Sequence, residues 1–262
     1  MTINRNCAIA LLGLGCILDP ACAAELRLLT AGAYKPVVMA LMPDFEKQTG
    51  HTVTVQNDTA GALARRVSGG EPFDVVVLTP GVLRELAQSS AQGAANSPGK
   101  VLPDSIRTLA RVAIGVAVKQ GAPLPDISTV ARFQETLLAA RAVAYIDPEA
   151  GGSSGIYLSQ WMEKAGIADR IRPKAVLVPG GLVAQRVVSG QADIALHQIS
   201  EILAVPGAQL VGPIPAEIQN YTVYAGAVST GTRDTAAAKA LLDHLGSPAA
   251  QVVLRDKGMQ AP

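Results

Sequence analysis

The side chains best suited to acid–base chemistry stand in turns that follow apolar runs. His197 directly follows the predicted strand 192–196, and an imidazole titrates close enough to neutrality to act as a general base or acid. Tyr34 and Lys35 stand in the turn after the predicted strand 26–30 and are predicted to take part in catalysis beside His197. Lys35 is also predicted to hold a carboxylate of the ligand. Further rivals for the role of base are Asp147 and Glu149.

Small and hydroxyl-bearing residues fill the other turns that follow apolar runs. Such turns open helices, whose free backbone N–H groups and positive dipole ends attract anions. Each turn alone is equally typical of an ordinary strand-to-helix connection, but several aimed at one cleft indicate an anion site. We therefore predict a substrate-binding set of Ala33, Thr59, Ala60, Ser153, Ser154, Gly180 and Gln198.

The run 151–155, Gly-Gly-Ser-Ser-Gly, matches no nucleotide or nucleophile motif. No Gly-Lys-Ser/Thr follows it, so it is not a phosphate-binding P-loop, and it lacks the G-x-S-x-G of a nucleophile elbow. It can cradle a carboxylate through N–H groups and the Ser153 and Ser154 hydroxyls, or it is a flexible turn. Both interpretations remain open from the residues alone.

The chain contains few residues that could bind a metal ion or act as a thiol nucleophile. The three cysteines stand at positions 7, 16 and 22, and the three histidines at 51, 197 and 244 are too scattered for a zinc motif. We predict no metal site, no disulfide in the exported chain and no cofactor.

The elements that must position these residues alternate between strand and helix. Strands are predicted at 26–30, 51–55, 73–78, 112–118, 142–146, 175–178, 192–196 and 221–228. Helices are predicted at 36–49, 62–67, 79–88, 155–165, 182–189, 235–245 and 248–257, with an exposed loop at 89–100. Parallel sheets covered by helices follow from this order. The fold class is therefore α/β, in two lobes with a ligand cleft between them. The first lobe takes residues 24–110 plus 223–262, and the second takes 111–222.

Residues 1–23 are typical of a secretory signal peptide. Arg5 precedes an apolar stretch at 8–18, and Ala21-Cys22-Ala23 fits a small-x-small cleavage site. The apolar stretch is shorter than the roughly 20 residues that span a bilayer. A buried N-terminal helix is the alternative, disfavoured by Pro20. The sequence thus predicts export to the periplasm.

Composition excludes two classes of protein. The 262 residues carry a formal charge of +1 with a pI near 7.7, whereas nucleic-acid-binding domains usually have a pI above about 9. Hydrophobic residues make up 49% of the chain, which is too many for an intrinsically disordered protein. We expect a folded protein that binds no nucleic acid.

Several of these segments resemble the periplasmic molybdate-binding proteins of ABC importers. The resemblance covers nearly the whole exported chain, through the strand-turn-helix 28–50, Ala62-Leu63-Ala64-Arg65-Arg66, Pro72-Phe73-Asp74-Val75, Asp147-Pro148-Glu149, 154–157 and the strand at Tyr221. It implies a periplasmic-binding-protein-like fold with the ligand between the lobes. It also implies a small anionic ligand, with an ABC permease as partner if the protein serves transport.

The chain departs from this family at its ligand positions. The two serines of the family fall on Ala33 and Ala60, and its tyrosine falls near Gln198. Alanine donates no hydrogen bond to an oxyanion, so tight molybdate binding is not expected. The cation and hydroxyls that replace the serines suit an organic polycarboxylate.

The whole set of these segments, including 212–213 and 216–221, resembles a divergent branch of the family that includes periplasmic aconitate isomerases. That resemblance implies allylic proton transfer on a tricarboxylate without a cofactor. The alternative is a binding protein that hands a polycarboxylate or oxyanion to a permease. We expect a monomer in either case.

Overall fold

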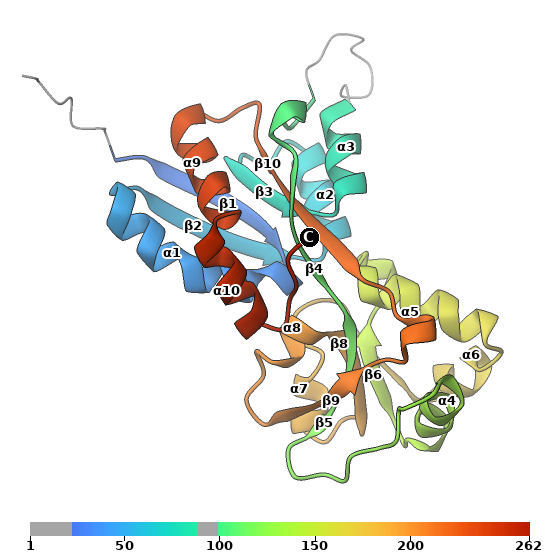
Figure 1. The fold of residues 1–262 in the computed structure, drawn as a ribbon. Coiled ribbons are helices and arrows are strands. Elements are labelled where there is room, and N and C mark those ends of the chain that lie inside the picture. Colours follow the sequence, from blue (N-terminus) through green and yellow to red (C-terminus); the bar gives the residue numbers. More distant parts are fainter. Residues whose placement is uncertain (1–22, 89–98) are drawn as a thin grey trace, which may run out of the picture.

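The computed structural model describes residues 23–88 and 99–262. All but the last residue of the predicted signal peptide, all three cysteines and most of the predicted loop 89–100 lie outside the described residues. The rest of the chain forms two lobes, each built on its own five-stranded sheet (Figure 1). No helix in the described ranges is long and apolar enough to cross a membrane.

The first lobe is built on the sheet β2-β1-β3-β10-β4. Strands β1, β2 and β3 run parallel, and β10 lies antiparallel between β3 and β4. The strands are β1 (Glu25–Ala31), β2 (Thr52–Asp58), β3 (Val75–Leu78), β4 (Arg107–Val112) and β10 (Thr222–Val228). The helices are α1 (Lys35–Thr49), α2 (Ala60–Ser68), α3 (Pro80–Gln88), α9 (Thr235–Leu245) and α10 (Pro248–Asp256), with short 3-10 turns η1 (Gly32–Tyr34) and η2 (Pro103–Ser105).

Both faces of this sheet are covered. Helices α1, α9 and α10 pack on one face around Leu28, Phe45 and Leu241, and α2 and α3 pack on the other around Leu63 and Leu83. Alternate residues of β1 serve the two cores, because successive side chains of a strand point to opposite faces. The sheet is therefore fixed from both sides, and its carboxyl edge is a rigid base for the loops that follow.

The second lobe is built on the sheet β7-β6-β8-β5-β9. Strands β6, β7 and β8 are parallel, and β5 is antiparallel to both β8 and β9. The strands are β5 (Ile114–Lys119), β6 (Val143–Ile146), β7 (Ala175–Val178), β8 (Ile194–Gln198) and β9 (Ala208–Pro213). The helices are α4 (Val130–Ala139), α5 (Ser153–Lys164), α6 (Ala168–Ile171), α7 (Gln185–Val188) and α8 (Ile199–Ile202), with 3-10 turns η3 (Pro148–Ala150), η4 (Arg172–Lys174) and η5 (Ala216–Ile218).

The chain passes between the sheets at two places. Strand β4 ends at Val112 and β5 begins at Ile114, so only Ala113 separates strands of different lobes. The second passage runs from the end of β9 to the start of β10. There the Gln219 side chain accepts from the Ile114 N–H and donates to the Ile114 carbonyl, both at 2.9 Å. One amide side chain thus ties the two passages together.

The α/β two-lobe fold predicted from the sequence is confirmed, while several of its elements differ, and helix α4 was not predicted. The single strand predicted at 112–118 belongs to two strands, because the apolar run 109–118 continues from one sheet into the other. Strand β9 was not predicted at all. The helix predicted at 182–189 shortens to the four residues of α7.

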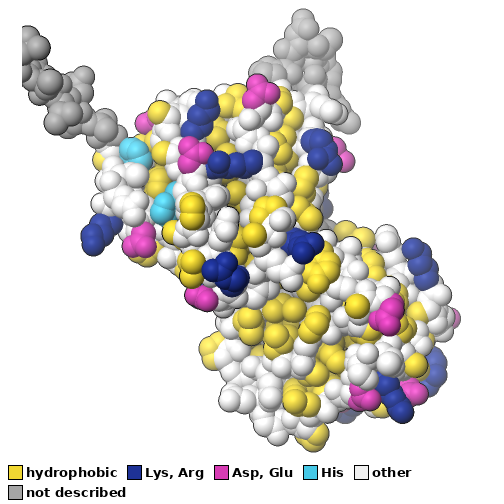
Figure 2. All heavy atoms as spheres, viewed as in Figure 1, with side chains coloured by type: hydrophobic (Ala, Val, Ile, Leu, Met, Phe, Trp, Pro, Cys, Tyr) yellow, Lys and Arg dark blue, Asp and Glu magenta, His cyan; other side chains and the backbone are white. Residues whose placement is uncertain are grey.

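Figure 2 shows one face of the molecule, with a waist where the lobes meet. On this face basic and acidic side chains are interspersed over both lobes, and apolar side chains lie between them (Figure 2). Small groups of both signs are mixed on this face, and the net charge of the whole chain is +1.

Candidate functional site

A polar pocket lies between the lobes, at the carboxyl ends of β1, β2, β6 and β8. The first lobe lines it with residues 31–33, residues 57–60 and Tyr224. The second lobe lines it with Ile146, residues 152–154, Gly181, His197, Gln198 and Glu201. Ligands of open α/β sheets bind at this edge, because the strand ends leave a crevice there.

Three helical segments begin at the pocket wall. Helix α2 begins after Thr59, whose hydroxyl accepts from the Ala62 N–H as an N-cap. Helix α5 begins with Ser153 after Gly152, and the turn η1 begins at Gly32. The positive ends of α2 and α5 therefore face one small space from opposite lobes, which favours a bound anion.

His197 and Glu201 form a buried pair on the pocket floor. The His197 Nε2 lies 3.1 Å from the Glu201 Oε2, with side chains 2% and 9% exposed. Burial lowers the pKa of His197 to about 3 and raises the pKa of Glu201 to about 8, because each loses hydration of its charged form. Near neutral pH the pair is therefore uncharged overall and shares protons between its two members.

The imidazole of this pair has one nitrogen without a partner. His197 Nδ1 is buried and makes no hydrogen bond to the protein. Buried polar atoms are nearly always paired, so an orphan in a pocket wall points to a group supplied from outside. The Gln198 Oε1 beside it is also unpaired, while its Nε2 donates to the Thr222 hydroxyl at 2.8 Å.

Gly32 makes room for the Glu201 carboxyl. A Cβ at position 32 would lie 2.6 Å from the Glu201 Oε1, so a side chain there would displace the carboxyl. The adjacent Ser200 hydroxyl donates to the Ala33 carbonyl at 2.8 Å, which fixes α8 against the first lobe. Across the pocket, a side-chain hydrogen bond joins Tyr224 of the first lobe to Ser153 of the second.

The described pocket wall contains two carboxyl groups and no lysine or arginine. Asp58 is balanced by Arg66, whose Nη1 lies 3.7 Å from the Asp58 Oδ2, and Glu201 pairs with His197. An anion in this pocket would be held by backbone N–H groups and hydroxyls. The cavity itself measures about 40 Å³, close to the space of one water molecule.

Most of the predicted site residues meet in this pocket. Those lining it are Ala33, Thr59, Ala60, Ser153, Ser154, His197 and Gln198. Gly180 lies just beside it, since a Cβ there would be 4.0 Å from the Asp58 Oδ1, and Gly181 takes its place in the wall.

Tyr34 and Lys35 are not brought to the pocket, contrary to the prediction. The turn η1 rotates Tyr34 into the core of the first lobe, where it is fully buried and donates to the Leu245 carbonyl at 3.2 Å. Lys35 begins α1 with an exposed side chain and does not line the pocket. The rivals Asp147 and Glu149 also lie outside the lining, and Asp147 instead caps η3.

Several lining residues were not predicted, among them Gly32, Glu201 and Tyr224. Glu201 carried a usable signal, because it stands four residues after His197 in the largely apolar stretch 199–205, an unusual place for an unpaired carboxylate. Tyr224 carried none, since its strand enters the first sheet from far along the chain. Among the described residues no cluster of three histidine, cysteine or acidic side chains could hold a metal ion.

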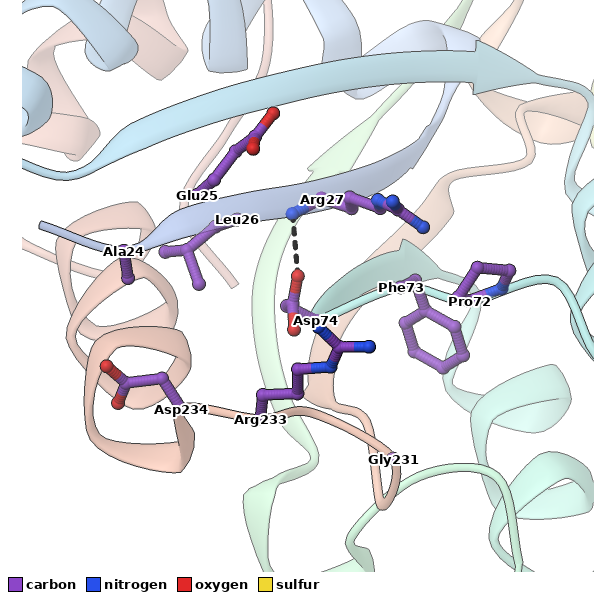
Figure 3. Close-up of a pocket in the computed structure, with 10 residues that line it drawn as sticks. All are labelled: Ala24, Glu25, Leu26, Arg27, Pro72, Phe73, Asp74, Gly231, Arg233 and Asp234. Atoms are coloured by element: carbon purple, nitrogen blue, oxygen red, sulfur yellow. Dashed lines mark hydrogen bonds between the residues drawn. The ribbon is translucent and has the colours of Figure 1, made fainter.

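A larger cavity of about 400 Å³ lies at the opposite end of the first lobe (Figure 3). It sits beside the amino ends of β1 and β3, where Asp74 accepts from the Arg27 N–H at 2.8 Å. Asp74 also accepts from the Thr232 hydroxyl at 2.6 Å, so its carboxylate serves the local fold. Among its described lining residues, only Asp234 stands at the start of a helix, α9, and the Asp234 carboxylate caps that helix.

The chain is similar to both enzymes and binding proteins. It is 34% identical over 241 residues to an aconitate isomerase from a Pseudomonas species, which covers 90% of this chain and 87% of that protein. It is 24% identical over 270 residues to the molybdate-binding protein ModA of Azotobacter vinelandii, covering 98% of each. The solved structure of the periplasmic molybdate-binding protein from that organism superimposes with a TM-score of 0.75 at 21% identity, covering 91% of this chain and 100% of that one.

A family model places the chain more broadly. The model described as bacterial extracellular solute-binding protein matches residues 26–260, which include both lobes and every residue of the interlobe pocket. The sulfate-binding protein SubI of Mycobacterium tuberculosis shares the fold at a TM-score of 0.70 and 18% identity, covering 91% of this chain and 87% of that one. This protein therefore belongs to the bacterial extracellular solute-binding protein family.

Proposed function

We propose that this protein is a periplasmic aconitate isomerase that interconverts cis- and trans-aconitate without a cofactor. The observation that carries the proposal is the buried His197–Glu201 pair, whose imidazole has one unpaired nitrogen and lines a pocket that favours anions. The 34% identical aconitate isomerase supports it. We also propose that the protein acts as a monomer after removal of residues 1–23.

The proposed reaction is an allylic proton transfer. His197 Nδ1 takes a proton from the methylene carbon of the substrate, the double bond moves by one carbon, and a proton is returned at the other end of the three-carbon unit. The C–H bond broken at one end is replaced by one formed at the other, so no electron is gained or lost. Proton transfer by a positioned side chain contributes typically 10²–10⁴-fold to a rate.

Glu201 positions the imidazole for this step. When the His197 Nε2–H donates to Oε2 of the neutral Glu201 carboxyl group, Nδ1 carries a lone pair and can accept the proton of the substrate. The imidazolium that forms keeps this hydrogen bond to Glu201, which strengthens when the donor is charged. Charge that develops on the substrate carboxylate faces the N-termini of α2 and α5, and preorganised dipoles of this kind often supply the largest part of catalysis.

The second candidate function is transport, in which the protein hands a polycarboxylate or oxyanion to an ABC permease. The family and the molybdate-binding relatives favour it. A cavity of about 40 Å³ also suits a small oxyanion better than a six-carbon acid, which would require the lobes to move apart. Against molybdate itself stand Ala33 and Ala60, which line the pocket without a hydroxyl donor.

One experiment separates the two functions. Purified protein is incubated with cis-aconitate in deuterated water and followed by proton NMR, with the His197→Gln variant as the matched control. Catalytic formation of trans-aconitate by the wild type alone supports the isomerase. Stoichiometric binding without turnover overturns it and leaves transport. Calorimetry with molybdate on ligand-stripped protein tests the oxyanion alternative, for which micromolar affinity would be decisive.

A further inference from the structure

The two lobes touch at the mouth of the interlobe pocket through backbone atoms. The Gly61 N–H, in the first turn of α2, donates to the Gly151 carbonyl at 3.0 Å. A Cβ at Gly61 would lie 2.9 Å from the Gly151 Cα, and a Cβ at Gly151 would lie 2.8 Å from the Gly61 Cα. Real Cβ atoms do not approach that closely, so any other residue at either position would hold these backbones apart.

A second bond beside it follows the same pattern. The Thr59 hydroxyl donates to the Ala150 carbonyl while it accepts from the Ala62 N–H. Two neighbouring hydrogen bonds therefore join the start of α2 in the first lobe to the end of η3 and the following Gly151 in the second lobe. The Thr59 hydroxyl proton is donated to the Ala150 carbonyl, so this hydroxyl has only its remaining lone pair for other partners.

Closure at the mouth brings the anion-binding elements together. Ala60 of α2 and residues 152–154 of α5 lie directly beside the touching glycines in sequence, and all of them line the pocket. Opening of the mouth would separate the N-termini of α2 and α5 by a similar distance. Their combined attraction for one anion falls as that distance grows.

We propose that Gly61 and Gly151 are positioning residues that set how far the lobes close, and thereby how tightly the pocket holds its anion. The inference rests on the anion site of the proposed function and does not require turnover. Because Gly61 and Gly151 have no side chains, the two backbones can approach each other closely. Gly151 also adopts a φ of 78°, which favours glycine.

Gly61 allows a clean test because its backbone is helical. Alanine there gains helix propensity, so Gly61→Ala disturbs the mouth without straining α2. Gly81 is a matched control. It is also the second residue of a nine-residue helix in the first lobe, and a Cβ at Gly81 meets nothing within 4 Å. Gly151→Ala is unsuitable, because backbone strain would mix with the effect on closure.

The experiment compares wild type, Gly61→Ala and Gly81→Ala. The probe is propane-1,2,3-tricarboxylate, a saturated analogue of aconitate that cannot isomerise. We expect Gly61→Ala to bind it at least about tenfold more weakly by calorimetry and to lose the compaction that saturating probe produces in small-angle X-ray scattering. Gly81→Ala is expected to match wild type in both, and all three should melt within about 4 °C of one another.

The outcomes distinguish this inference from the proposed function. Wild-type affinity and wild-type compaction in Gly61→Ala overturn the role of the glycines, whatever the turnover. Normal compaction of the wild type with no isomerisation of cis-aconitate counts against the proposed function alone. Equal weakening in Gly61→Ala and Gly81→Ala also overturns the inference, because it shows a general effect of alanine in these helices.

Discussion

The floor and the mouth of the interlobe pocket are held together in opposite ways. At the floor, α8 belongs to both lobes: Ile199 packs against the core of the first lobe, and Ile202 is part of the core of the second. The Ile199 N–H also donates to the carbonyl of Ala113, the residue between the two sheets, at 3.0 Å. Buried side chains and apolar contacts therefore fix the floor. In Figure 1, α8 lies where the lobes meet.

At the mouth, by contrast, the Gly61 N–H and the Thr59 hydroxyl donate to the carbonyls of Gly151 and Ala150. Such contacts are individually weak, at about 0.5–1.5 kcal/mol net. A motion of one lobe against the other would move the mouth most and the floor least. The proposed proton-transfer pair therefore lies where such a motion changes the geometry least, and capture of the ligand depends on the mouth, which can open.

The largest expected effect comes from the floor. His197→Gln should lower kcat for cis-aconitate by about 10²–10⁴-fold, because the removed nitrogen acts mainly in the transition state. Affinity for propane-1,2,3-tricarboxylate should change by less than about threefold, since the donors of the wall remain. Steady-state kinetics and calorimetry measure the two values. A variant that keeps the wild-type kcat would show that His197 is not the base, and the floor would then have no catalytic role distinct from that of the mouth.

Glu201 should make stability depend on pH. Its pKa is raised from 4.5 to about 8 by burial, so between these values the folded protein holds a proton that the unfolded chain releases, and stability falls as pH rises. The pKa of His197 is lowered from 6.5 to about 3, so its contribution is lost as pH falls through that range. The two oppose each other between pH 4.5 and 6.5, and stability declines from 6.5 to 8 with a slope of at most about 1.4 kcal/mol per pH unit.

Denaturant titrations of wild type and Glu201→Gln over this range measure the effect. The difference in unfolding free energy between the two proteins isolates Glu201, because all other titrating groups are common to both. The variant should lack the decline above pH 6.5. Parallel pH profiles for the two proteins would show that Glu201 is ionised in the folded state.

A smaller effect is expected from Ser153 in the wall. Ser153→Ala removes one hydroxyl that faces the pocket and bonds to Tyr224, which should weaken binding of propane-1,2,3-tricarboxylate by up to about tenfold. Ser159→Ala, on the same helix and outside the lining, is the control. Calorimetry on both variants decides it, and equal affinities would remove the Ser153 hydroxyl from the site.

The smallest effect is expected from Lys35. Its side chain is exposed and does not line the pocket, so Lys35→Ala should leave KM and kcat unchanged within about twofold. Steady-state kinetics on cis-aconitate beside Lys47→Ala, a lysine in the last turn of the same helix, is the measurement. A rise in KM of tenfold or more would restore the earlier expectation that Lys35 holds a carboxylate.

The sequence predicted those site residues whose position follows from local structure alone. Ser153 and Ser154 open a helix after a buried strand, and Thr59 caps another, so strand-end reasoning placed them correctly at the pocket. It failed for Tyr34 and Lys35, because the 3-10 turn η1 decides which way those side chains point. Local pattern contains no information about that rotation.

Long-range contacts set the other limit of prediction. Tyr224 reaches the pocket because β10 pairs with β3, about 150 residues earlier in the chain. Strand β9 lies at the edge of the second sheet and is only partly buried, so its apolar signal is weak. The α/β class and the interlobe position of the site needed only the alternation of elements, and both were therefore accessible from the sequence.

The insertion of β10 between β3 and β4 also constrains how the protein folds. The first sheet cannot be completed until residues 222–228 are available, whereas all strands of the second sheet lie in the continuous stretch 114–213. Contacts between distant residues form slowly, because the intervening chain must first be ordered. The second lobe is thus free to fold first and to bring the two ends of the first lobe together. Substitutions that weaken the second lobe would then slow the assembly of the first, even where they touch none of its residues.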